Sequence, residues 1–252
     1  MNKNIMNKNI HEQEDILYKE WLQSYSKEEQ AQFCMDGLCS ISDVEGQYGE
    51  QEEKMWINAK RRIVFLMKET NGNPNEDYRE WQWPTVYHRT FNIVFKWLQG
   101  LSTVSETFIP SLNHEGDYFD TPNEVIGKYP LAIVNVKKIA GGTQASISAI
   151  QEYAERDKDF LRTQVADILQ PNIVVCCGYS DTYGCYMTEI AKKFIYPKLS
   201  FMKINNWCFY CKEKNILLID SWHPGARKSQ EEKIDEMMLN VNEFIISEHP
   251  DF

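Results

Sequence analysis

The sequence predicts an α/β fold with three layers, in which helices cover both faces of a short, mostly parallel sheet of four strands. The first observation is a set of short, wholly apolar runs, which suit strands buried on both faces, at residues 63–67, 131–136, 173–177 and 216–220. The second is that helical patterns separate these runs, as crossover helices separate parallel strands. The third is that each run ends in polar or glycine-containing sequence, where open α/β sheets bind ligands.

Length and composition indicate one domain. The chain has 252 residues, with 42% hydrophobic and 13% aromatic residues, which argues against disorder. We find no stretch typical of a linker, so we expect a single domain over residues 13–252. A short duplicated sequence occupies the first ten residues, and we expect residues 1–12 to form a disordered leader.

Charge and targeting signals limit the possible partners. The net charge of −10 differs from that of a basic nucleic-acid coat protein, so any contact with DNA or a nucleobase must come from a local cleft. The N-terminal segment has no apolar signal region, and no stretch approaches the roughly 18 apolar residues that span a bilayer. We expect a soluble, cytoplasmic monomer with reduced thiols, no membrane contact and no cofactor.

The cysteines leave one metal-site alternative open. Cys208 and Cys211 form a CxxC inside a strand-like run, while Cys34 and Cys39 flank Gly37. An iron–sulfur or zinc site could be drawn from the two pairs. Their spacing matches no standard pattern and free cysteine is commonly buried, so we expect no metal.

The helices are predicted from apolar periodicity and breaker residues. Pro84 is placed to open a helix that ends near Gly100, and residues 101–127 are predicted to be a long connection. The apolar run at 207–211 is expected to form a hairpin with the last strand. The other expected helices cover residues 14–24, the second half of 45–60, 146–154, 158–169, 181–195 and 229–245.

Chemically useful side chains follow these strands. Parallel, adjacent strands would bring them to one edge of the sheet: Glu69 and Asn71, then Asn135, Lys137 and Lys138, then Asp220, His223 and Arg227. Each also has a structural explanation. Glu69 could be a solvated carboxylate, Asn135 could satisfy the backbone, and the two lysines could be surface charge. His223 could be a turn histidine, and Asp220 could cap the turn or hold the histidine in one tautomer.

Together the segments resemble motifs of the uracil-DNA glycosylase superfamily over roughly residues 60–245. The similar segments are Lys68-Glu69-Thr70-Asn71-Gly72, Asn135-Val136-Lys137-Lys138, the third strand with Gly178, and His223-Pro224-Gly225. Lys68 stands where the family usually has glycine, and Gly225 where it has serine. The iron–sulfur cysteines of the branch with the nearest first motif have no match.

The resemblance implies excision of a deaminated base from DNA by hydrolysis of the N-glycosidic bond. A flipped base leaves through a transition state like an oxocarbenium ion. The implied roles are Glu69 for water and the sugar cation, His223 for the departing base, Asn135, Asn71 and Tyr78 for base binding, and Lys137 and Arg227 for phosphate.

Two other readings remain open. A protein of the same fold could bind a nucleotide, a modified base or a partner without catalysis, as the acidic charge and altered motifs favour. An unrelated hydrolase could instead pair His223 with a cysteine nucleophile, although no cysteine lies at a recognisable nucleophile turn.

Overall fold

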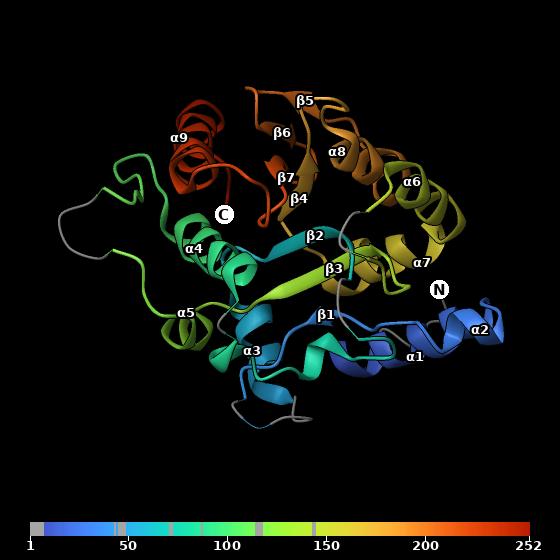
Figure 1. Cartoon of the computed structure of the whole chain (residues 1–252). Coiled ribbons are helices and arrows are strands. Elements are labelled where there is room, and N and C mark those ends of the chain that lie inside the picture. Colours follow the sequence, from blue (N-terminus) through green and yellow to red (C-terminus); the bar gives the residue numbers. More distant parts are fainter. Residues whose placement is uncertain are drawn as a thin grey trace.

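The computed structural model describes residues 8–42, 44, 49–70, 73–86, 88–113, 118–142 and 145–252. These residues form an α/β fold with helices around a mixed sheet of seven strands (Figure 1). The strand order is β1-β3-β2-β4-β7-β6-β5. The α/β class is therefore as predicted, whereas the expected sheet of four mostly parallel strands is not.

The four predicted strands lie together at the centre of this sheet. They are β2 (Ile63–Glu69), β3 (Ala132–Lys137), β4 (Ile173–Tyr179) and β7 (Ile216–Trp222), and each is parallel to its central neighbours. Antiparallel pairing adds β1 (Gly37–Leu38) beside β3, β6 (Cys208–Cys211) beside β7, and β5 (Met202–Lys203) beside β6. The hairpin of β6 and β7 was predicted. The two-residue strands are too short to leave an apolar pattern.

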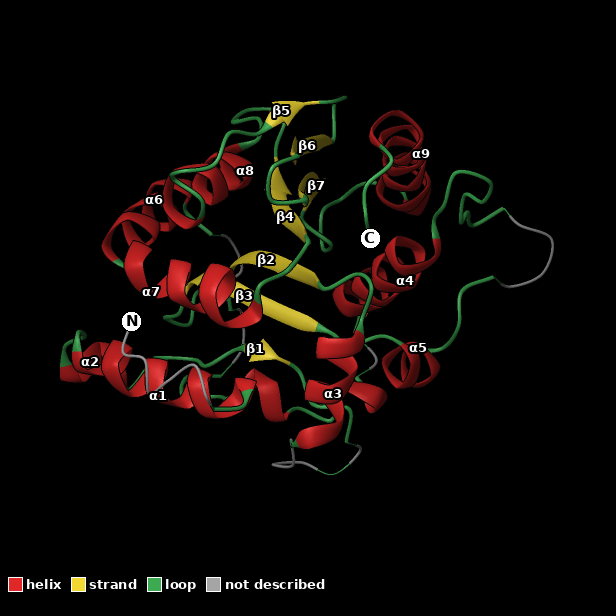
Figure 2. Cartoon of the chain, turned by 180° about the vertical axis from the view of Figure 1, so that it is seen from behind, coloured by secondary structure: helices red, strands yellow, loops and turns green. Residues whose placement is uncertain are grey.

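Helices cover both faces of the sheet, as the two views from opposite sides show (Figures 1 and 2). One core lies under α4 (Arg89–Thr103), α5 (Pro122–Lys128) and α9 (Gln230–Glu248). The opposite core lies under α1 (Ile10–Gln23), α3 (Glu50–Asn58), α6 (Ile147–Arg156), α7 (Lys158–Arg162) with its π-helical continuation η3 (Thr163–Leu169), and α8 (Tyr186–Ile190) with η4 (Ala191–Ile195). The short elements are α2 (Lys27–Gln30), η1 (Tyr78–Glu80) and η2 (Trp83–Thr85).

The alternation of side chains along each strand decides which groups share a face. In β2, Phe65 and Met67 pack in the core under α4 and α9, whereas Leu66 packs in the opposite core. The same two-residue period continues to Glu69 in β2. Met67 is opposite Asn135 in the register of β2 and β3, so the amide of Asn135 belongs to the same face.

The start of α4 and the connection that follows it differ from the sequence prediction. Pro84 lies in η2, and α4 begins only at Arg89 because His88 forms its N-cap, with Nδ1 accepting a hydrogen bond from the Thr90 amide at 3.3 Å. The predicted long connection contains α5, which begins with Pro122 and a capping box. The last described residues of that connection are therefore helical.

The disordered leader expected over residues 1–12 overlaps α1, which begins at Ile10. Residues 1–7 lie outside the described part of the chain. Asn9 caps α1, its side chain accepting a hydrogen bond from the Glu12 amide at 2.8 Å, and Ile10 and His11 are buried. Residues 10–12 thus belong to α1. Their apolar and ionic contacts extend the buried part of the helix beyond the apolar face that the sequence pattern shows.

Neither a membrane span nor the four-cysteine metal site is found among the described residues. None of the helices there has the length and apolar character to cross a membrane. Cys34 and Cys39 flank β1, whereas Cys208 and Cys211 lie in β6. The four central strands separate the two pairs, so these cysteines cannot bind one metal ion.

Candidate functional site

A pocket of about 290 Å³ lies at the carboxyl ends of the central strands. We call it the base pocket, after the ligand that the sequence resemblance implies. Its residues come from β2, β3, the segment that includes η1 and η2, the start of α4, and the turn after β7. The lining residues are Met67, Glu69, Thr70, Tyr78, Trp81, Trp83, Val86, His88, Thr90, Phe91, Ile133, Asn135 and His223. Four predicted site residues, Glu69, Tyr78, Asn135 and His223, therefore line one cavity.

Glu69 is held in place by a cation and by a glycine. Its Oε2 lies 2.5 Å from Nζ of Lys137, which is its direct neighbour in the register of β2 and β3. A Cβ on Gly141 would lie only 2.2–2.4 Å from the Glu69 carboxyl group, so only glycine leaves room for it. Oε1 accepts no hydrogen bond within the described residues, which leaves it available to a ligand or water.

This ion pair bears on the phosphate-binding role predicted for Lys137, which stays a prediction. The Lys137 side chain is only 13% exposed and its ammonium group is committed to Glu69. A phosphate could reach it only by competing with that carboxylate. Lys137 therefore orients Glu69 instead of presenting a free cation at the surface.

Asn135 is oriented by the buried carboxylate of Asp36. The Asn135 side-chain amide Nδ2 donates to Asp36 Oδ2 at 3.1 Å, and the backbone amide donates to the same oxygen at 2.9 Å. Because a carboxylate accepts hydrogen bonds but cannot donate them, the side-chain atom of Asn135 beside Asp36 must be the amide nitrogen and not the oxygen. The contact leaves the Asn135 carbonyl oxygen and one N–H for recognition of a ligand.

Asp36 itself belongs to a network that the sequence did not reveal. Lys138, for which the sequence left surface charge as one explanation, is fully buried and forms an ion pair with Asp36. Tyr18 and Gln164 also donate to this carboxylate, at 3.1 and 3.3 Å. The network rigidly connects α1, β1, η3 and the end of β3 beneath the base pocket.

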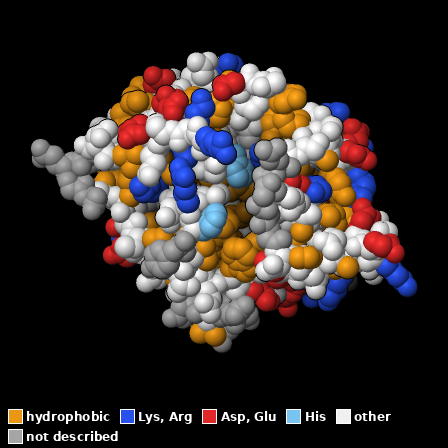
Figure 3. Space-filling view, viewed as in Figure 1, with side chains coloured by type: hydrophobic (Ala, Val, Ile, Leu, Met, Phe, Trp, Pro, Cys, Tyr) orange, Lys and Arg blue, Asp and Glu red, His pale blue; other side chains and the backbone are white. Residues whose placement is uncertain are grey.

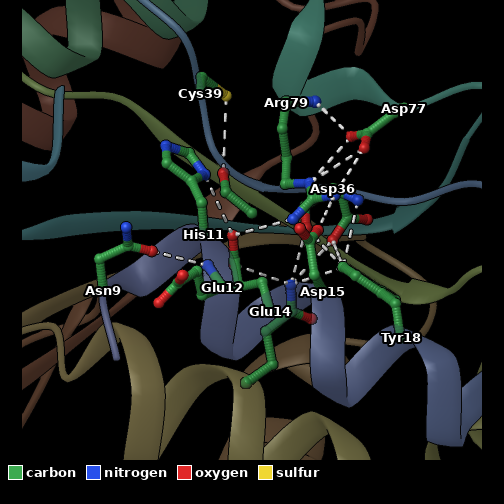
Figure 4. A network of polar contacts seen from close by, with 12 residues as sticks. Asn9, His11, Glu12, Glu14, Asp15, Tyr18, Asp36, Cys39, Asp77 and Arg79 are labelled. Atoms are coloured by element: carbon green, nitrogen blue, oxygen red, sulfur yellow. Dashed lines mark hydrogen bonds and ion pairs between the residues drawn. The ribbon is translucent and has the colours of Figure 1, made fainter. Parts of the chain in front are cut away.

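A second part of this network, which includes Arg79, Asp77, Asp15 and Glu14, is shown in Figure 4. Arg79, next to Tyr78, lies 2.6 Å from Asp77 and 2.9 Å from Asp15 of α1. Beside it, Glu14 is fully buried, and burial raises the pKa of its carboxyl to about 7. The ion pairs attach the Tyr78 segment to α1, so the aromatic wall of the pocket is anchored from behind.

Aromatic rings form that wall. Tyr78 and Trp81 lie with their ring centroids 4.3 Å apart, and Trp83 meets Phe91 edge-on at 4.9 Å. The indole N–H of the fully buried Trp83 donates to the Tyr78 carbonyl at 2.8 Å. A wall of tilted aromatic rings beside polar strand ends is suited to a planar ring with polar edges.

His223 is a neutral imidazole with a defined tautomer. Burial, with Lys68 and Lys233 nearby, lowers the pKa of His223 to about 4. The Gly225 backbone amide donates to Nδ1 at 3.1 Å, so Nδ1 is unprotonated and Nε2 carries the proton. The turn is fixed by Lys233, whose Nζ donates to the carbonyls of Pro224 and Ala226 at 3.2 Å each. His223 can therefore donate one hydrogen bond without carrying charge.

Asp220 does not orient His223, contrary to one sequence interpretation. It accepts a hydrogen bond from the Thr188 hydroxyl of α8 at 2.8 Å and lines a different cavity. In β7, Leu217 and Ile219 pack under α9, whereas Leu218 packs in the opposite core. The same alternation directs Asp220 toward α8. The tautomer of His223 is set by the backbone of its own turn.

Of the remaining predicted residues, Lys137 and Arg227 lie outside the pocket lining. Arg227 is exposed on the turn after β7, and Asn71 falls outside the described residues. Sequence reasoning missed His88 and Lys233, and it missed Asp36. The His88 contact with the Thr90 amide is a helix-cap pattern that could have been recognised, whereas Asp36 precedes a strand of only two residues.

We expect His223 to make folding stability depend on pH. Its pKa is about 4 in the folded protein and about 6.5 when unfolded, so the unfolded state binds the proton first as pH falls. Relative to His223→Gln, wild type should lose up to about 3 kcal/mol of unfolding free energy between pH 7.5 and 4. Urea titrations across this range measure the difference.

Comparison with the His223→Gln variant removes the contributions of other titrating groups to the pH dependence of stability. Burial raises the pKa of Glu14 to about 7 and of Asp220 to about 6, which act in the opposite direction. Both groups are present in both proteins, so their contributions cancel. A stability difference that does not change with pH would show that His223 is not buried as a neutral group.

Comparisons with known proteins add no assignment. No family model matches the chain, and no match was found among curated proteins. Within the described structure, no cysteine lines the base pocket, and burial raises the pKa of the Cys176 and Cys177 thiols. The cysteine-hydrolase alternative therefore has no support in the geometry of this site.

Proposed function

We propose that the protein releases a deaminated base from a nucleic acid by hydrolysing its N-glycosidic bond, as a divergent relative of the uracil-DNA glycosylases. The observation that carries the proposal is the base pocket, where Glu69, Asn135 and His223 from three separate strand ends line one cavity with an aromatic wall. The reaction needs a carboxylate near the sugar, a group that binds the base and a hydrogen-bond donor to the departing base. An acid, an amide and a neutral imidazole can supply these.

In the proposed reaction, water adds to C1′ of the sugar as the bond from C1′ to the base nitrogen breaks. The bonding electron pair leaves with the base, and water supplies the hydroxyl on C1′ and, in net terms, the proton on the base. Glu69 orients the water and offsets positive charge on the sugar through its available oxygen. His223 donates from Nε2 to an oxygen of the departing base, and its neutral state suits donation to a developing anion.

Asn135 would determine which base edge is accepted. Its orientation by Asp36 leaves one carbonyl oxygen and one N–H for the ligand. Such a pair matches a ring edge where an N–H lies beside a carbonyl, as in uracil and hypoxanthine. Cytosine and adenine present a donor and an acceptor in the opposite order, so an amide held in one orientation would face donor with donor and acceptor with acceptor.

The Glu69–Lys137 contact favours a second candidate, a protein that binds a base or nucleotide without cleaving it. An ion pair of 2.5 Å already occupies one oxygen of the proposed catalytic carboxylate. Under this alternative, Glu69 is structural and the pocket only recognises a ring. The two functions differ in one observable, the appearance of free base.

The experiment is therefore to detect free base released from single- and double-stranded oligonucleotides that contain uracil or hypoxanthine. We expect release by wild type, with His223→Ala slower by about 10²–10³-fold because one hydrogen-bond donor to the leaving group is lost. Binding of these oligonucleotides without release of any base would favour the binding function. Neither binding nor release would contradict both.

A further inference from the structure

A second pocket, of about 430 Å³, lies beside the base pocket and is rich in positive charge. We call it the cation pocket and define it by Arg89, Lys96, Lys228 and Lys233, which line it. It lies where α4 and α9 begin. Figure 3 shows Lys and Arg side chains gathered beside His side chains on the face where these helices lie in Figure 1.

Carboxylates compensate the charges of this pocket only in part. Among the described residues, Lys228 is the member with ion pairs, whereas Lys96 contacts the neutral amide oxygen of Gln230 at 3.0 Å. Asp120 is the carboxylate that lines it within the described structure, and it already lies 2.6 Å from Lys128. The nearest carboxylates to the Lys228 ammonium group are at 3.7 and 3.8 Å. Arg89 contributes, with burial, to lowering the pKa of Lys233, so the cations repel one another. An anion would relieve that repulsion, although the whole chain carries a net charge of −10.

The N-termini of two helices add to the positive electrostatic potential of the cation pocket. The first turns of α4, with 15 residues, and of α9, with 19 residues, border the pocket. The N-terminal ends of helices carry partial positive charge and favour bound anions. Ser229 and Glu232 cap α9, so the side chains, more than free amide groups, would hold the ligand there.

The start of α4 separates the two pockets and contributes residues to both. Arg89 lines the cation pocket, while its neighbours His88 and Thr90 line the base pocket. Lys233 lines the cation pocket and donates to the carbonyls of Pro224 and Ala226, in the turn that carries His223. A ligand in the base pocket could therefore extend around one short turn into the cation pocket.

We propose that the cation pocket binds a phosphate group of the ligand whose base enters the base pocket, so that the protein acts on nucleotides in a chain and not on free bases or nucleosides. The link to a base rests on the proposed function, whereas binding of phosphate does not. The phosphate could belong to a polynucleotide or to a mononucleotide, and competition separates these sources.

The test measures binding of a fluorescent single-stranded oligonucleotide without any deaminated base, over a range of salt concentrations. The variant is the double substitution Arg89→Gln with Lys96→Gln, which leaves Lys233 to hold the His223 turn. If both cations meet phosphate, the slope of log K against log salt should fall by about 1.4 and binding should weaken. The matched control is Lys158→Gln with Lys193→Gln, which removes two charges from the exposed surfaces of α7 and η4 and should leave the slope unchanged.

Competitors then identify the source of the phosphate. We expect an unlabelled oligonucleotide to compete well, inorganic phosphate and a nucleoside monophosphate weakly, and a nucleoside not at all. A monophosphate that competes as well as the oligonucleotide would contradict action on a chain. Equal competition by a nucleoside, an unchanged salt slope in the double variant, or no oligonucleotide binding by wild type would overturn the proposal.

Failure of this inference can be told apart from failure of the proposed function. Base release with an unchanged salt slope would leave the glycosylase proposal standing and remove the phosphate site. A reduced slope without release of any base would do the opposite.

Discussion

Glu69→Gln should reduce the rate of base release by about 10²–10⁴-fold, the usual contribution of a positioned acid–base group. Glutamine retains the shape of the side chain and an oxygen that can accept from Lys137. The contact with β3 is therefore kept, and the side chain still fills the space beside Gly141. What is lost is the negative charge that faces the sugar cation and the water. Single-turnover measurements on a uracil-containing oligonucleotide report this loss directly.

The matched control is Glu155→Gln on the exposed surface of α6, where the side chain is 59% exposed. It removes the same charge from the protein without touching the base pocket, and its rate should equal that of wild type. Glu69→Gln should bind oligonucleotide as wild type does. If its rate of release is also unchanged, Glu69 has only a structural role.

Asp36→Asn should have the largest effect on folding, lowering the unfolding free energy by about 3–5 kcal/mol. The substitution leaves the fully buried ammonium group of Lys138 without its carboxylate. Breaking one side of a buried ion pair is costly because the remaining charge is neither solvated nor paired. Urea denaturation monitored by tryptophan fluorescence measures the change.

The double variant Asp36→Asn with Lys138→Met separates charge from shape. Methionine fills much of the space of lysine without its charge, so most of the lost stability should return. A single variant within about 1 kcal/mol of wild type would contradict the importance of this ion pair. The same conclusion would follow from a double variant no more stable than the single one.

The central strands could be predicted because burial on both faces leaves continuous apolar runs such as 63–67. Parallel pairing then places their carboxyl ends together, which is why Glu69, Asn135 and His223 could be chosen as candidates. The edge strands could not be found in this way. A strand of two residues, such as β1, gains its pairing from β3 and has too few side chains to show a period.

Polar partners were harder to predict than polar site residues. Lys138 looks like surface charge in sequence because nothing nearby along the chain reveals Asp36, 102 residues away. Closeness in sequence suggests His223 as one possible partner of Asp220, whereas strand alternation directs Asp220 to Thr188. Pairing across the fold is a tertiary property, and it decided the roles of Lys137, Lys138 and Asp220.

A crystal structure with a single-stranded oligonucleotide that carries a non-hydrolysable uracil nucleotide would test the central claim most directly. We expect the uracil ring against Tyr78 and Trp81, with Asn135 and the Nε2 of His223 within hydrogen-bond distance of its polar edges and C1′ facing Glu69. A base bound at another cavity, or a base pocket that stays closed to the ring while the oligonucleotide is bound elsewhere, would contradict the account.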